Sequence, residues 1–196
     1  MPEPPPREPN RATTVKILVS AASRHGSTAE IAARIAGTLR SGLPGDTVVE
    51  VLPAADVGDP ASYDAFILGS SVYLGRWLED GRKLAERIAT HPPRPVWLFS
   101  SGPVGDPAKP AEEPAGIGDL VQATHARGHR LFAGSLNRHQ LGFGEKAVVR
   151  ALRVPDGDFR DWSAITTWAT QIAAELTRPA RGEPAAATEG LRAEDS

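Results

Sequence analysis

Residues 23–28, SRHGST, place three hydroxyl groups around one glycine, between an aliphatic run and an amphipathic helical pattern. This position predicts a turn that leads from a strand into a helix. A helix N-terminus presents unpaired N–H groups and the positive end of the helix dipole, and Ser23, Ser27 and Thr28 add hydroxyl donors. Gly26 lets the backbone approach an oxygen atom closely or adopt a positive φ. The turn therefore predicts a phosphate site.

A simpler interpretation of the same turn is that its hydroxyls only cap the helix, because serine and threonine are common N-cap residues. One cap needs one hydroxyl, and this turn has three. The two common nucleotide motifs are missing, since no G-x-G-x-x-G follows the first aliphatic run and no G-x-x-x-x-G-K-[ST] occurs in the chain.

Two further loops carry groups that suit a flat ring beside a phosphate. Segment 69–77, GSSVYLGRW, surrounds an aromatic residue, Tyr73, with small residues that include Ser71, and its Trp77 is expected to pack in the core. Segment 100–107, SSGPVGDP, is rich in backbone donors. The contacts expected from this second loop are Ser101, Gly102, Val104 and Gly105.

Alternating strands and helices must position these loops. Strands are expected at 15–21, 47–52, 65–71, 95–101 and 129–136. Helices are expected at about 27–41, on a stripe from Trp77 to Ile88, more weakly at 113–127, and on a stripe from Ile165 to Leu176 that Asp161 caps. The order predicts an α/β doubly wound parallel sheet, strand order 2-1-3-4-5, with helices on both faces. Ligands bind such sheets beyond the carboxyl ends of the strands, where residues 23–28 lie.

Composition limits the remaining possibilities. The chain has 196 residues, a formal charge of −2 and no cysteine, which disfavours nucleic acid as a partner and excludes thiol chemistry and iron–sulfur clusters. Its five histidines lack metal-ligand spacing, so neither a metal nor a catalytic residue is assigned. One domain is expected at 14–178, between disordered tails at 1–13 and 179–196. No hydrophobic leader or membrane span is apparent, which predicts a cytoplasmic protein.

Residues 23–28 resemble the phosphate loop of the flavodoxin family, T/S-x-T-G-x-T, with His25 in place of a threonine. The resemblance covers nearly the whole folded region and implies that FMN is the cofactor. It implies that the FMN phosphate is held by Ser23, His25, Gly26, Ser27 and Thr28, with His25 acting through its backbone amide. It also implies that Tyr73 and the loop 101–105 flank the isoalloxazine ring.

An insert at about 137–161 separates the last expected strand from the last helix, and it is far longer than usual. This outline is similar to the menaquinone-dependent protoporphyrinogen IX dehydrogenases, which implies a flavoprotein oxidoreductase with a quinone acceptor and a porphyrin substrate. Basic residues at 138–153 leave three interpretations open: contact with an anionic membrane surface, contact with a porphyrin, or a solvated helix, whose apolar side could also mediate a homodimer. Asp158, Arg160 and Asp161 are expected to pair or cap.

Three other classes of protein are alternatives to an FMN oxidoreductase. An electron-transfer flavodoxin would dock on a redox protein, but many such carriers are strongly acidic and this chain is not. A phosphoryl-accepting receiver needs acids after the first strand, where this chain has Ser20, Ala21 and Ala22. A scaffold without a cofactor is the third class, and bound flavin would distinguish it.

Overall fold

The computed structural model describes residues 14–102, 113–136 and 156–178. The strands are β1 (Lys16–Ala22), β2 (Val48–Pro53), β3 (Ala65–Tyr73), β4 (Arg76–Trp77), β5 (Val96–Ser101), β6 (Gly128–Phe132), β7 (Ser135–Leu136) and β8 (Gly157–Asp158). The helices are α1 (Ser27–Gly42), α2 (Glu79–Ala89), α3 (Ile117–Thr124) and α5 (Trp162–Thr177), with short 3-10 turns η1 (Ala54–Asp56) and η2 (Pro60–Ser62).

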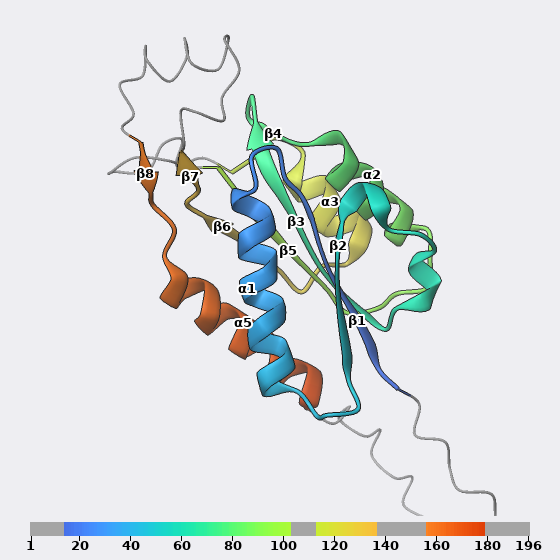
Figure 1. Ribbon diagram of the computed structural model, residues 1–196. Helices are drawn as coiled ribbons and strands as arrows, with labels where there is room; N and C mark the ends of the chain where they lie inside the picture. The colour runs from blue at the N-terminus through green and yellow to red at the C-terminus, as the bar shows by residue number, and fades with distance from the viewer. Residues whose placement is uncertain (1–13, 103–112, 137–155, 179–196) are drawn as a thin grey trace, which may run out of the picture.

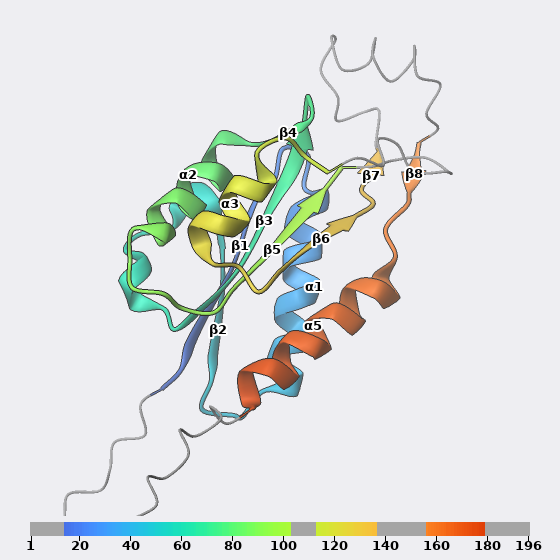
Figure 2. The same ribbon diagram turned by 180° about the vertical axis from the view of Figure 1, so that it is seen from behind.

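Five parallel strands form the sheet in the order β2-β1-β3-β5-β6, which confirms the predicted doubly wound α/β order. Helices α1 and α5 pack together on one face, and α2 and α3 cover the other (Figures 1 and 2). The interior strand β1 sends Ile17 and Val19 into the first layer and Leu18 into the second, because side chains alternate along a strand. Burial on both faces explains its continuous apolar sequence.

The two helices of the first layer follow the predicted apolar stripes. Ile31, Ile35 and Leu39 of α1 are fully buried, and each contributes about 1.5–3 kcal/mol relative to an exposed side chain. Helix α5 begins after Asp161, whose side chain accepts a hydrogen bond from the Ala164 N–H at 2.9 Å. The predicted cap is therefore confirmed.

The structure corrects three predicted elements. Trp77 lies on β4 rather than on a helix, because the chain after β3 turns back and β4 pairs antiparallel with it. The expected helix at 113–127 is only the two turns of α3, since Gly116 and His125 adopt positive φ at its two ends. The expected strand at 129–136 divides into β6 and β7, and β7 pairs with β8, a strand that the sequence analysis missed.

One hydroxyl in the core lacks a partner, and its removal is expected to stabilise the fold. Ser20 on β1 is 1% exposed, and its Oγ has no hydrogen bond among the described residues. Because an unsatisfied buried hydroxyl is unfavourable, Ser20→Ala should raise the free energy of unfolding by about 1 kcal/mol in urea denaturation. The matched control is Ser70→Ala: Ser70 Oγ accepts from the Leu78 N–H at 2.9 Å, so its loss should lower stability. Equal destabilisation by both substitutions would contradict this explanation.

Candidate functional site

Three loops meet at the carboxyl edge of the sheet, as the strand order requires. Thr28 at the start of α1 lies 2.8 Å from Ser71 of β3, hydroxyl to hydroxyl. Ser71 in turn pairs in register with Ser101, the last residue of β5. Gly102 follows, and a Cβ there would lie 2.9 Å from the Cβ of Val72. Predicted site residues from all three loops are thus adjacent.

The turn at 23–28 has the geometry of an anion site. Gly26 is the N-cap residue of α1 with φ 84°, and no side chain caps the helix, so the simpler capping interpretation does not hold. A Cβ at Gly26 would meet nothing within 4 Å, which leaves the start of α1 open to a ligand. Ser23 Oγ is buried and has no hydrogen-bond partner among the described residues.

The other predicted residues of this turn have specific neighbours. Ser27 Oγ accepts a hydrogen bond from the Ser135 N–H at 3.0 Å, which leaves its own proton available to a ligand. Thr28 is 1% exposed and shares its hydroxyl with Ser71, so only one proton of that pair is engaged. His25 is half-buried, between the exposed Arg24 and Gly26.

On the side expected to hold a ring, the structure places Tyr73 at the tip of the β3–β4 hairpin. Tyr73 is 38% exposed, and the guanidinium of Arg24 lies 4.2 Å from the centroid of its ring. Leu74 and Gly75 form the turn, with φ of 50° and 74°. Leu74 is 86% exposed, and a non-glycine residue at positive φ is strained by about 1 kcal/mol or more. The sequence analysis missed Leu74, because nothing in a leucine signals this backbone conformation.

Some predicted residues lie outside the described part of the chain. These are Val104 and Gly105 of the loop after β5, together with most of the insert, including residues 138–153. At the end of the insert, Arg160 donates to Asp158 at 2.7 Å, which confirms that these charged residues pair. Arg160 also reaches Glu30 of α1 at 2.8 Å, a contact that the sequence analysis missed because the two residues are 130 positions apart.

A chain of hydrogen bonds runs through the second layer behind the carboxyl edge. Trp77 Nε1 donates to Ser100 Oγ at 2.7 Å, and Ser100 Oγ lies 2.8 Å from His129 Nε2. An indole N–H only donates, so Ser100 Oγ accepts from Trp77, and His129 Nδ1 lies 3.5 Å from Glu113 Oε1. Ser100 is fully buried, so the chain holds Trp77 and His129 in place and offers no nucleophile.

Burial of His129 predicts a pH dependence of stability. Burial lowers the pKa of His129 below its ordinary value of 6.5, and the Glu113 carboxylate offsets only part of this. Below pH about 6.5 the unfolded chain gains the proton more readily, so the free energy of unfolding should fall as pH drops from there toward the folded pKa. Urea denaturation between about pH 7.5 and 5 measures this loss. His129→Gln should remove this part of the pH dependence. If the free energy of unfolding fell equally with pH in the variant and the unmodified protein, His129 would not be its cause.

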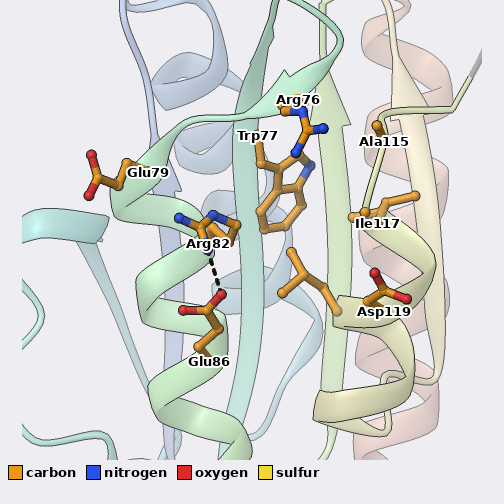
Figure 3. Close-up of a pocket in the computed structure, with 10 residues that line it drawn as sticks. Arg76, Trp77, Glu79, Arg82, Glu86, Ala115, Ile117 and Asp119 are labelled. Carbon is orange, nitrogen blue, oxygen red and sulfur yellow. Dashed lines mark hydrogen bonds and ion pairs between the residues drawn. The ribbon is translucent and has the colours of Figure 1, made fainter.

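A cleft of about 580 Å³ lies between α2 and α3 (Figure 3). Trp77 forms part of its wall, Arg82 and Glu86 of α2 form an ion pair at 2.8 Å on one side, and Asp119 of α3 lies across from them. Residues of the turn do not line this cleft, so it is separate from the anion site.

Within residues 14–102, 113–136 and 156–178, no group of three or more acidic or histidine side chains is arranged to hold a metal ion. In the same residues, no helix has the length and apolar character needed to cross a membrane.

Comparisons with known proteins agree with this fold. A family model described as a flavodoxin domain matches residues 18–163. A flavodoxin from the domain Archaea has a TM-score of 0.58 and 17% identity, over 84% of this chain and 100% of its own. A flavodoxin from Streptococcus pneumoniae TIGR4 has a TM-score of 0.54 and 16% identity, over 83% and 97%. Rubredoxin oxygen:oxidoreductase from Desulfovibrio gigas has a TM-score of 0.56 and 13% identity, over 82% of this chain and only 36% of its own. No curated protein matches the sequence.

Proposed function

The chain belongs to the flavodoxin family, and from this premise we propose that it is an FMN-dependent oxidoreductase. Members of the family bind FMN. The cofactor supplies the redox chemistry, while the protein supplies binding, orientation and control of solvent access. The proposal therefore depends on whether the residues of this particular chain fit the cofactor.

The observation that carries the proposal is the buried Ser23 hydroxyl without a partner, at a helix start that no side chain caps. Buried polar groups in folded proteins are nearly always hydrogen-bonded, so an orphaned hydroxyl at such a place indicates a ligand. A phosphate oxygen at this position would accept from Ser23 and from N–H groups at the start of α1. The hydroxyl proton of Ser27, which is not used by its hydrogen bond with Ser135, would be a further donor to the phosphate.

The rest of the carboxyl edge suits the remainder of FMN. The paired hydroxyls of Thr28 and Ser71 would line the path between the phosphate and the ring. The exposed Tyr73 and the strained Leu74 would lie beside the isoalloxazine, where they would exclude water from one side. Strained exposed residues concentrate at ligand sites, which supports a role for this hairpin.

We favour an enzyme with a quinone acceptor over a carrier that docks on a redox protein, because the chain has a charge of only −2. Porphyrin as the substrate, contact of residues 138–153 with a membrane surface and a homodimer all depend on the insert, most of which lies outside the described residues. They stay predictions, as does the cytoplasmic location.

Acceptor preference tests the proposal and its alternative. Protein loaded with FMN is reduced without oxygen and mixed with either a water-soluble quinone or cytochrome c, and return of the oxidised absorption bands is timed. A quinone-linked oxidoreductase should react faster with the quinone, and an electron carrier faster with cytochrome c. Protein that takes up no FMN would contradict both the oxidoreductase and the electron carrier. The chain would then be interpreted as a scaffold without a cofactor.

A further inference from the structure

Arg160 occupies an unusual position for an arginine close to a phosphate site. It lies between β8 and α5, and its side chain is only 7% exposed. Its Nε and Nη2 donate to the two carboxylate oxygens of Asp158 at 2.7 and 2.8 Å. Its guanidinium also lies 4.3 Å from the ring centroid of Trp162. Such a bidentate, stacked arginine is held in one orientation.

The remaining donors of Arg160 reach the start of α1. Nη1 donates to the Ser27 carbonyl at 3.3 Å and to Glu30 Oε2 at 2.8 Å. Four of the five N–H groups of the guanidinium are thus engaged within the protein. The hydrogen bonds to Asp158 and Glu30 raise the pKa of Arg160, so its charge is permanent. Arg160 therefore acts on the helix start and has little capacity left to bind a phosphate directly.

Ser27 of α1, whose carbonyl accepts from Arg160, is also held through its hydroxyl. β7 and β8 pair antiparallel, with Ser135 opposite Asp158, and the pair lies at the edge of the sheet where α1 begins (Figures 1 and 2). The Ser135 N–H donates to Ser27 Oγ at 3.0 Å. One strand thus reaches the hydroxyl of Ser27, and the other reaches its carbonyl through Asp158 and Arg160.

We propose that Arg160 is a positioning residue for the FMN phosphate, which acts by fixing Ser27 and by pairing with the Glu30 carboxylate. The inference rests on the proposed FMN site. Glu30 lies in the first turn of α1, where a phosphate would bind, and an unpaired carboxylate there would repel the dianion. Arg160 shares its one positive charge between Asp158 and Glu30, so it weakens that repulsion, and it orients the Ser27 end of the turn. The β7–β8 pair thus contributes to cofactor affinity without contact with the cofactor.

The test compares FMN with riboflavin, which lacks the phosphate, in Arg160→Gln and in a matched variant, Arg127→Gln. Arg127 also pairs with a carboxylate, Glu175 at 3.9 Å, and stacks on a tryptophan, Trp97 at 5.2 Å. Flavin fluorescence gives the dissociation constants, and hydrogen exchange of the apoprotein reports the amides of residues 27–30. Arg160→Gln should weaken FMN binding about tenfold or more, leave riboflavin binding nearly unchanged and speed exchange at these amides. Arg127→Gln should leave the affinities for both flavins and the exchange of these amides unchanged.

Two results would overturn the inference: unchanged FMN affinity in Arg160→Gln, or equal weakening of FMN and riboflavin, which would mean a purely structural role. Failure of the unmodified protein to bind either flavin is a different result, because it overturns the proposed function itself and the inference with it.

Discussion

Ser23→Asp is expected to weaken FMN binding about a thousandfold, because it places a carboxylate where the phosphate would accept a hydrogen bond. One pair of like charges about 4 Å apart near a protein surface is unfavourable by about 4 kcal/mol, and about 1.4 kcal/mol corresponds to a factor of ten. The position of the Ser23 hydroxyl is buried, so the new charge should lower the stability of the apoprotein, and its place near the positive end of α1 offsets part of that loss. Flavin titration and urea denaturation of one preparation measure the two effects.

Two control variants separate the effect of the position of Ser23 on FMN affinity from the effect of an added negative charge. Ser62→Asp adds the same charge at an exposed residue of η2, far from the turn, and should leave FMN affinity within about twofold of the unmodified protein, as a screened surface charge does. Ser23→Ala removes only the hydroxyl and should weaken binding about tenfold. Normal FMN affinity in Ser23→Asp would mean that the phosphate binds elsewhere.

Gly69→Ala is expected to lower the free energy of unfolding by about 3 kcal/mol or more, the largest effect on stability that we expect from a single methyl group. Gly69 of β3 lies in register with Phe99 of β5, and a Cβ at Gly69 would lie 2.0 Å from Phe99 Cζ. Phe99 is fully buried and packs against the rings of Phe132 and Trp168, each 6.2 Å away between centroids, so it has no space to move.

Denaturation in urea compares Gly69→Ala with Gly58→Ala, where a new Cβ would meet nothing within 4 Å and stability should change little. Phe99→Leu should restore part of the stability of Gly69→Ala, because it removes the atoms that collide with the new methyl group. Additive losses in the double variant would show that the two residues are not in conflict.

Much of the fold could be predicted from the sequence, because its signals are local. Ile31, Ile35 and Leu39 mark the buried face of α1 by their spacing alone, and Asp161 marks the start of α5. The strand order followed from the alternation of strands and helices. Trp77 was placed correctly in the core but on the wrong element, since a two-residue strand that turns back on β3 has no period to detect.

The candidate site was predictable only in part. The hydroxyls of the turn at 23–28 and Gly26 are visible in the sequence, because they are neighbours and their chemistry is that of an anion site. The contacts of Ser27 could not be predicted, since Ser135 and Arg160 lie more than 100 residues away in the sequence. Such contacts depend on how β7 and β8 return to the sheet edge, and no local pattern encodes that path.

Titration of the apoprotein with FMN and with riboflavin, followed by flavin fluorescence, tests the central claim most directly. The claim is that the turn at 23–28 binds the phosphate. Two or more hydrogen bonds to a charged phosphate, each contributing about 1.5–3 kcal/mol, should make FMN bind at least about a hundredfold more tightly than riboflavin. Equal affinity for the two flavins, or no binding of FMN, would contradict the claim.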